Sequence, residues 1–255
     1  TPAAAATTDT PAGLAKITSI SNNPFTDPVT TYIYGGDNQG QFWRFDLTSA
    51  TAGVVGVVKM GDAGSGQPIT SRPDVTQCLV NDTVAGVTTP RVQRVVLFGT
   101  GRLLDISDTT DNTTQSLYAL RDTGSPIANI RSSARVQQEL STVGASTNMN
   151  NYGVTNRKVD LAVKDGWYLD FNLNSGERVN LDPQVIAGGV NVVTNMPTSS
   201  SSCSVGGSSN VYQFAVCSGA AVTATTPTLP SQADIVTVAG NTLSTSSAAV
   251  GFIIV

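Results

Sequence analysis

The sequence contains no histidine, and only 13% of its 255 residues are charged. Without histidine the chain lacks the usual general base and the commonest transition-metal ligand, so a Ser-His-Asp triad is excluded. Lys and Arg total 14 against 18 Asp and Glu, and they form no basic cluster of the kind that a nucleic-acid groove requires. We therefore expect neither a histidine-dependent enzyme nor a nucleic-acid-binding protein.

Long apolar runs are missing as well. No segment reaches the ~20 apolar residues of a membrane helix, which predicts that the protein is not an integral membrane protein. The first residues, TPAAAATTDT, lack the charged and apolar regions of a signal peptide. The last residues, VGFIIV, follow a strand pattern with no turn after it, so we expect a fragment of a longer exported protein.

Cysteine is scarce, with three residues in the chain. Cys203 and Cys217 flank a turn-rich segment and a predicted strand, so an oxidising compartment would allow a disulfide between them. Two unpaired thiols are the alternative. Cys78 is left over and is predicted to be buried.

Thr, Ser, Asn, Gly and Val are abundant, which is typical of an exported all-β protein with a polar, uncharged surface. Residues 1–18 are rich in Ala, Thr and Pro and predict a linker or loop, whereas residues 19–255 predict one β domain. Residues 32–47 predict a hairpin, and residues 94–101 predict a strand that is buried on both faces. The one helix that the pattern allows lies around residues 132–140.

An aromatic strand recurs three times, as FWRFDL from residue 42, SLYALRD from residue 116 and NVYQFAV from residue 210. The intervals are about twice the ~40 to 50 residues of one propeller blade. This spacing favours a modified β-propeller, of which the chain would hold only a part, and a β-sandwich is the alternative.

Five segments in order resemble the PilY1/PilC family of type IV pilus proteins. They are YGGDNQGQFWRFDL at 34–47, PITSRP at 68–73, VLFGTGRLLDISDTTDNTTQSLYALRD at 96–122, GWYLDF with GERV at 166–179, and CSVGGSSNVYQF at 203–214. The resemblance implies the C-terminal propeller of a non-catalytic scaffold for pilus assembly, extension and retraction, and surface attachment. Such a protein is exported to the pilus tip or the outer-membrane surface. Its partners would be minor pilins, pilus-tip proteins and a host-cell or abiotic surface.

The same resemblance assigns structural roles within the first segment. Its glycines would permit the positive φ of a turn, its tryptophan would fill the core between blades, and its aspartates would accept backbone hydrogen bonds at corners. The residues concerned are Gly35, Gly36, Asp37, Gly40, Trp43 and Asp46.

The sequence offers two candidate positions for a metal site. Family members carry a calcium loop just before this segment, and here residues 21–28 offer Asn22, Asn23 and Asp27 without the alternating carboxylates of such loops. Asp105, Asp108 and Asp111 are spaced by three residues, which favours an acidic loop over a metal site. We therefore predict no cofactor, with calcium as the one candidate.

Two other function classes are compatible with the sequence. Quinone-dependent dehydrogenases share propellers with Gly-Asp-aromatic blades, although no matching cofactor constellation is recognisable here. A carbohydrate-binding module could stack sugars on Tyr152, Trp167 or Tyr168. Trp167 and Tyr168 are adjacent in a predicted strand, so we expect one of them to lie in the core. The Ser/Thr/Asn-rich loops at 105–115, 144–156 and 198–209 are the candidate contact surfaces.

Overall fold

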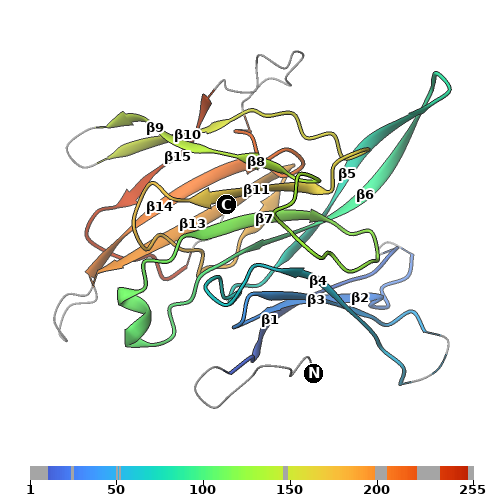
Figure 1. Ribbon diagram of the computed structural model, residues 1–255, viewed down its shortest axis with the longest axis horizontal. Coiled ribbons are helices and arrows are strands. Elements are labelled where there is room, and N and C mark those ends of the chain that lie inside the picture. The colour runs from blue at the N-terminus through green and yellow to red at the C-terminus, as the bar shows by residue number, and fades with distance from the viewer. Residues whose placement is uncertain are drawn as a thin grey trace.

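The computed structural model describes residues 11–23, 26–49, 51, 53–145, 149–198, 206–222 and 236–251, which form three β-sheets and one short 3-10 helix (Figure 1). The first sheet has the order β1-β2-β3-β4, the middle sheet β5-β6-β7-β11-β8, and the third sheet β12-β13-β14-β15-β10-β9. Neighbouring strands are antiparallel except β8 and β11, which are parallel.

The strands of the first sheet are β1 (Leu14–Ile20), β2 (Tyr32–Asp37), β3 (Gln41–Asp46) and β4 (Gly56–Asp62). Those of the middle sheet are β5 (Asp74–Val84), β6 (Val87–Gly99), β7 (Gln115–Arg121), β8 (Val136–Gln138) and β11 (Gly166–Phe171). Those of the third sheet are β9 (Leu140–Ala145), β10 (Asn150–Thr155), β12 (Gln184–Ile186), β13 (Gly189–Thr198), β14 (Gly206–Ala215) and β15 (Val236–Ser244). The 3-10 helix η1 (Ile106–Thr110) lies between β6 and β7.

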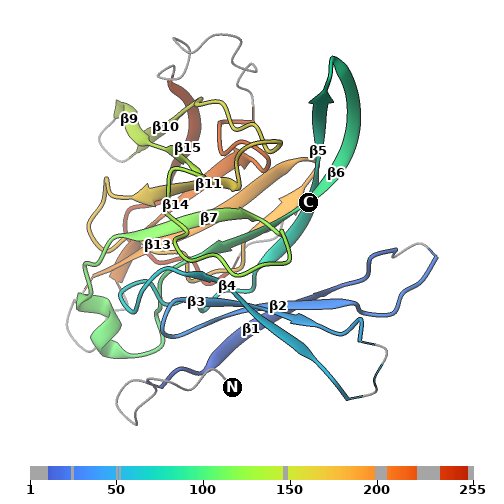
Figure 2. The same ribbon diagram turned by 45° about the vertical axis from the view of Figure 1, so that its right-hand side comes forward.

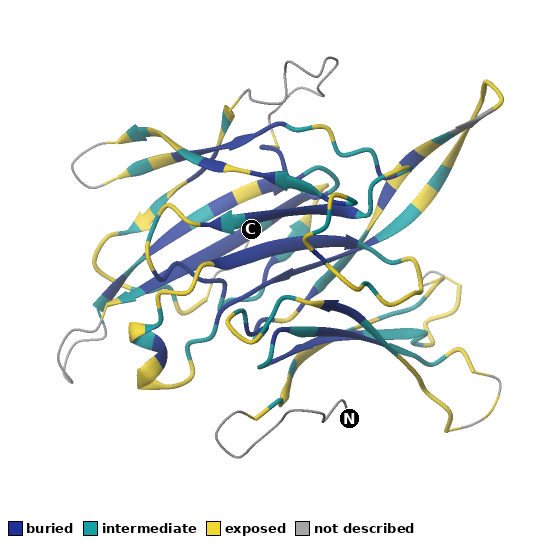
Figure 3. Cartoon of the chain, viewed as in Figure 1, coloured by how far each residue is buried: buried dark blue, intermediate teal, exposed yellow. Residues whose placement is uncertain are grey.

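The middle sheet is buried on both faces because the first and third sheets pack on its opposite sides (Figure 3). Successive side chains of a strand point to opposite faces. Leu97 and Leu117 accordingly join the cluster shared with the third sheet, whereas Phe98 and Tyr118 join the cluster shared with the first. The expectation of a doubly buried strand at residues 94–101 is confirmed for its central residues.

A row of stacked rings crosses the interface between the first and middle sheets. Phe42 of β3 lies 4.2 Å from Phe98 of β6, measured between ring centroids. Phe98 lies 5.2 Å from Tyr118 of β7, which lies 6.0 Å from Tyr168 of β11. Offset contacts of this kind stabilise beyond the area they bury, so this row ties β3 to the middle sheet.

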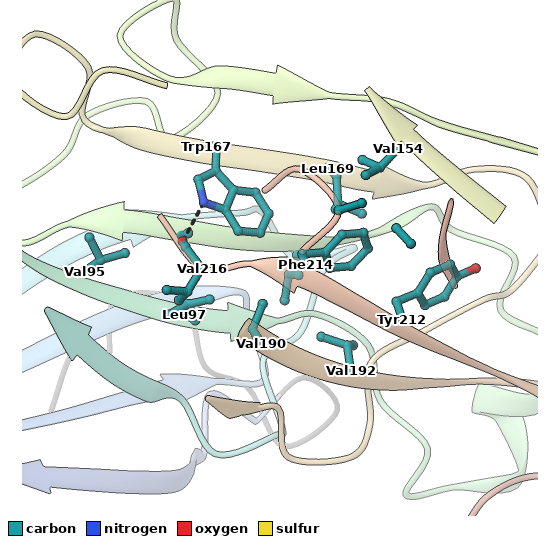
Figure 4. Close-up of a cluster of buried hydrophobic side chains, with 14 of the residues drawn as sticks. Val95, Leu97, Val154, Trp167, Leu169, Val190, Val192, Tyr212, Phe214 and Val216 are labelled. Carbon is teal, nitrogen blue, oxygen red and sulfur yellow. Dashed lines mark hydrogen bonds between the residues drawn. The ribbon is translucent and has the colours of Figure 1, made fainter. Parts of the chain in front are cut away.

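The interface between the middle and third sheets is the larger cluster drawn in Figure 4. Trp167 of β11 is fully buried, and its indole N–H donates a hydrogen bond of 2.9 Å to the carbonyl of Val216. Tyr212 and Phe214 of β14 stack with centroids 5.7 Å apart beneath it. A buried indole with a satisfied N–H fixes how the two sheets lie on each other.

The three aromatic strands of the sequence are β3, β7 and β14, and each stands third in the order of its own sheet. The chain is thus all-β, as expected, and its three aromatic strands lie in three different sheets. Within the described residues the sheets are open and do not close into a ring. This arrangement is compatible with part of a propeller and with a sandwich.

Two local expectations are wrong. Residues 132–140 do not form a helix, because Val136–Gln138 is the strand β8, which pairs with β11. Residues 14–18, assigned to a linker, belong to β1, which pairs with β2 and carries Ile17 opposite Gly35. In both cases hydrogen bonding to an existing sheet edge overrides a weak local preference.

The expected disulfide is also wrong in its pairing. Cys217 is joined to Cys78, 139 residues away, with Cα atoms 5.9 Å apart. Cys203 lies outside the described residues. Cys78 is buried on the face of β5 that meets the third sheet, so the stacking of sheets brings it to Cys217. Cys78 is buried, as predicted, and the bond ties the middle sheet to the third.

Strands β5 and β6 continue beyond the sheet as a two-stranded arm, visible in both views (Figures 1 and 2). Their register is regular from Asp74 opposite Leu97 to Val84 opposite Val87. Ala85 and Gly86 close the arm with φ of 51° and 80°, the conformation of a tight hairpin turn. Only residues 95–99 of β6 pair with β7; Cys78 and Val80 of β5 still pack on the third sheet, and the tip of the arm beyond them is free of the middle sheet's other strands.

Candidate functional site

The loop between β6 and β7, residues 100–114, contains the helix η1 and several carboxylates, and we call it the acidic loop. Asp105 caps η1 by accepting the Ser107 N–H at 3.0 Å. Asp108 accepts the N–H groups of Leu104 and Asp105 at 2.8 and 3.0 Å, which completes a capping box. These carboxylates therefore hold the loop's own backbone.

Arg102 forms an ion pair with Asp108 inside the acidic loop. Its guanidinium lies 2.8 Å from the Asp108 carboxylate, which is almost fully buried. Burial alone would favour the neutral acid, but Arg102 and the two backbone N–H groups together lower the pKa of Asp108. Asp108 thus stays charged and holds the loop at physiological pH.

Arg178 anchors the acidic loop from behind. Its side chain is buried and donates to four carbonyls, those of Gly176 and Arg102 at 2.9 Å and those of Asp108 and Asp111 at 2.5 Å. Burial lowers the pKa of Arg178, and Asp111 and Asp108 oppose that shift. A planar guanidinium with several donors is suited to gathering carbonyls from two segments.

Two apolar side chains project from this rigid loop. Leu104 is 73% exposed and Ile106 is 80% exposed, although their backbones are held by the network described above. Isolated exposed apolar residues are ordinary, but two on one anchored loop form a small preorganised contact surface. The arrangement can bind a partner surface, and the carboxylates beside it are already engaged.

A second polar cluster joins the first and middle sheets. Asp122, at the end of β7, is buried and accepts from Arg44 at 2.8 Å and from the Tyr34 hydroxyl at 2.6 Å. Arg94 lies 3.5 Å from the same carboxylate and 4.7 Å from the Tyr32 ring centroid. Burial and the bond to Asp122 raise the pKa of Tyr34. This cluster supports the scaffold and offers no free reactive group.

The corner between β2 and β3 carries the motif residues expected from the sequence. The Asp37 carboxylate accepts the N–H groups of Gln39 and Gln41 at 2.9 Å and the Trp43 indole N–H at 3.0 Å. Gly40 has φ of 78°, and a Cβ there would lie 2.2 Å from the Gly64 carbonyl oxygen. Glycine is therefore required at position 40 for both backbone conformation and space.

The two glycines of β2 do different work from that expected, whereas Asp46 accepts a backbone hydrogen bond as expected. Gly36 is extended, and a Cβ there would lie 2.1 Å from the side chain of Ile69, so close packing rather than positive φ requires it. Gly35 similarly faces Ile17 and Leu14. Asp46 accepts the Thr48 N–H at 2.9 Å at the end of β3.

Trp43 is buried but does not belong to the cluster between the first and middle sheets. Its neighbour Phe42 fills that interface, because consecutive residues of β3 point to opposite faces of the sheet. The expectation that Trp43 fills the core between sheets is therefore wrong, and Phe42 takes that place.

The calcium candidates lie in one tight turn. The Asn22 side-chain oxygen accepts from Arg94 at 2.7 Å, and the Asp27 carboxylate accepts the Val29 N–H at 3.0 Å. Asn23 and Asp27 form an isolated bridge. A guanidinium beside Asn22 repels a cation, and calcium at this loop stays a prediction. Among the described residues no group of three or more His, Cys, Asp or Glu side chains could hold a metal ion.

The aromatic residues considered for sugar stacking are all buried. Tyr152, Trp167 and Tyr168 are 2%, 0% and 8% exposed, so none offers a ring face to solvent. The expected loop at 144–156 is largely the strand β10, and residues 199–205 of the third expected loop lie outside the described residues. The acidic loop is thus the candidate contact loop that the structure describes most completely.

Sequence reasoning missed Arg178, Asp122 and Arg44. A signal was present for the two arginines, since Arg44 interrupts the aromatic run FWRFDL and Arg178 follows Glu177 in the turn segment GERV. A charged residue inside an apolar or turn segment predicts a buried, paired group. The partners, however, are 78 residues away for Arg44 and up to 76 residues away for Arg178, and no local pattern identifies them.

Comparison with curated proteins gives relatives with one kind of name. The chain is 27% identical over 250 residues to "Type IV pilus biogenesis factor PilY1" of Pseudomonas aeruginosa strain PAO1, which covers 80% of this chain and 20% of that protein. It is 26% identical over 201 residues to "Type IV pilus biogenesis factor PilY1 homolog" of Xylella fastidiosa strain Temecula1, covering 76% of this chain and 14% of that protein.

The chain therefore spans a fifth or less of the length of these curated relatives. No protein-family model matches it, and no solved structure gives a significant match. In the described part of the chain, no helix has the length and apolar character needed to cross a bilayer.

Proposed function

Because the chain is PilY1-like, we propose that it is a non-catalytic scaffold segment of a type IV pilus biogenesis factor. The whole protein would act outside the cell, at the pilus tip or the outer-membrane surface. There it would assist pilus assembly, extension and retraction through minor pilins and pilus-tip proteins, and it would attach the pilus to a host-cell or abiotic surface.

The rigidity of the stacked sheets supports this proposal. Aromatic rings, the Asp122 cluster and the Cys78–Cys217 disulfide each connect two sheets. A scaffold that transmits force or holds partners in register benefits from such connections, because its loops cannot move relative to one another. Function then belongs to the loops that the sheets display.

The acidic loop is the surface that we assign to the pilin contact. Leu104 and Ile106 project from it, while Arg178 and Asp108 fix its backbone. Burying each side chain in a partner contributes about 1.5–3 kcal/mol. Because the loop is preorganised, little of this gain is lost to ordering it on binding.

The test measures binding of purified minor pilins to the immobilised chain by biolayer interferometry. We expect the wild-type chain to bind and the double variant Leu104→Asp with Ile106→Asp to bind at least about tenfold more weakly. Val163→Asp is the matched control, since Val163 is 74% exposed and lies outside the acidic loop. Circular dichroism checks that all variants are folded.

Two results would count against the proposal in different ways. If the double variant binds as tightly as the wild type, the acidic loop is not the contact surface. If the wild-type chain binds no minor pilin, alone or mixed, the scaffold proposal itself is wrong.

A further inference from the structure

The outer edge of the middle sheet is formed by β5. Its first residue, Asp74, bonds to Val185 of β12, but its later residues lack the usual protection of edge strands. Natural edge strands are blocked by lysine, proline or bulges that prevent pairing with another strand. Residues 74–84 contain no lysine and no proline, and their pairing with β6 shows no register shift. The opposite strand, in contrast, carries Pro90 and Arg91 on the arm.

The charge of the arm is balanced within it. Between residues 75 and 84 the only charged side chain is Asp82, which pairs with Arg91 across the arm. A partner strand consequently needs no compensating charge, and it would meet a neutral edge. This condition favours as the occupant another strand whose charge is balanced within its own hairpin.

Exposed apolar side chains lie beside this edge. Leu79 of β5 is 72% exposed, and Val92, directly opposite it on β6, is 59% exposed. Directly opposite residues of an antiparallel pair share one face, so the two side chains form an apolar pair on the solvent side of the arm. Cys78 and Val80 point to the other face and are buried.

We infer that β5 pairs with β5 of a second copy of this chain, antiparallel about a two-fold axis at Leu79. In this register Leu79 meets Leu79 of the second copy, and Cys78 meets Val80. Gln77 then meets Asn81, and Thr76 meets Asp82. Across residues 76–82, apolar residues face apolar residues, amides face amides, and a hydroxyl donor faces a carboxylate, with no like charges opposite each other.

Neighbouring registers lack this complementarity. An axis at Val80 places Leu79 opposite Asn81 and Cys78 opposite Asp82. An axis at Cys78 places Gln77 opposite Leu79 and Thr76 opposite Val80. The axis at Leu79 also brings both Leu79–Val92 pairs together, so that four exposed apolar side chains form one row across the joined sheets.

The Cys78–Cys217 bond supports this interface, because it anchors the strand next to Leu79 to the third sheet. The paired edge is therefore held in place before association, which reduces the ordering cost. A self-complementary edge with a two-fold axis gives a closed dimer rather than a chain of copies. This inference does not rest on the pilus function.

The test is sedimentation velocity of the purified chain over a micromolar concentration series. We expect the wild-type mass to double with concentration. Leu79→Lys places two like charges opposite each other, so it raises the dimer dissociation constant at least about tenfold. Leu79→Asp does the same. An equimolar mixture of Leu79→Lys and Leu79→Asp regains the dimer, because residue 79 faces residue 79.

Val163→Lys is the control, as Val163 is 74% exposed and distant in sequence from the arm, and it should dimerise as the wild type does. Thermal unfolding followed by circular dichroism confirms that the variants fold. A wild-type chain that stays monomeric throughout the series overturns the proposal. So does a dimer that persists in Leu79→Lys, or a mixture of the two charged variants that does not associate.

Discussion

The disulfide between Cys78 and Cys217 leads to a quantitative prediction. It closes a loop of 139 residues between the middle and third sheets. The chain-entropy relation gives about 17 cal/mol/K for a loop of this length, or about 5 kcal/mol at 25 °C. We therefore expect Cys78→Ser to lower the free energy of unfolding by up to about 5 kcal/mol.

The same change can be stated as a melting temperature. Unfolding entropy is about 2.1 cal/mol/K per residue, which for 255 residues is about 0.54 kcal/mol/K. A loss of about 5 kcal/mol then lowers Tm by about 9 °C. Calorimetry of wild type, Cys78→Ser and Cys217→Ser measures it, and the two variants should lose equal amounts.

Cys203→Ser is the matched control for this prediction. Because Cys78 and Cys217 pair with each other, Cys203 has no remaining cysteine partner in the chain, and its replacement should leave Tm unchanged. Reducing agent should lower Tm of the wild type to that of Cys78→Ser. The reasoning is refuted if reduction leaves the wild-type Tm unchanged, or if Cys203→Ser costs as much as Cys78→Ser.

Three further predictions concern glycine, a buried charge and pH. Gly40→Ala should lower the free energy of unfolding by ~1–3 kcal/mol, which is more than the loss in Gly53→Ala. Both glycines have positive φ, but only at Gly40 would an added Cβ meet a backbone carbonyl. Equal losses of the two variants in urea unfolding would contradict this. Asp122→Asn should lower the free energy of unfolding by about 3–5 kcal/mol, since it leaves the buried guanidinium of Arg44 without its charged partner. Asp182→Asn, in the more exposed pair with Lys16, should lower it by ~0–1 kcal/mol. The folded pKa of Asp108 is lowered, so its contribution is present above the unfolded value of about 3.9 and is lost as pH falls through the folded value. Urea unfolding from about pH 6 to about pH 3 should therefore show a shallower acid loss in Asp108→Asn than in the wild type, and parallel curves would contradict that assignment.

Much of the fold could be predicted from short-range patterns. The hairpin of residues 32–47 follows from β-formers on both sides of a glycine-rich turn, and it appears as β2 and β3. The continuous apolar run at residues 95–98 predicts a strand with two buried faces, which the two hydrophobic clusters confirm. These features depend on neighbours within one strand or turn, where sequence and structure are directly related.

Other features could not be read in this way. The segment around residue 136 became a strand because β11 offered a free edge, and its own sequence carries little preference. The acidic loop could be located from its aspartates, but its anchor Arg178 comes from a different connection in the chain. Sequence patterns do not indicate which distant segments will meet.

The amino-acid sequence alone determined the all-β class, the recurrence of aromatic strands and the PilY1-like character, because each depends on residue types and their order. Only the tertiary structure decided that Cys78 pairs with Cys217, that Phe42 rather than Trp43 packs against the middle sheet, and that Leu104 and Ile106 stand exposed on an anchored loop. The physical reason is that stacking of sheets sets these contacts, and stacking depends on the shape and registry of whole faces rather than on any one segment.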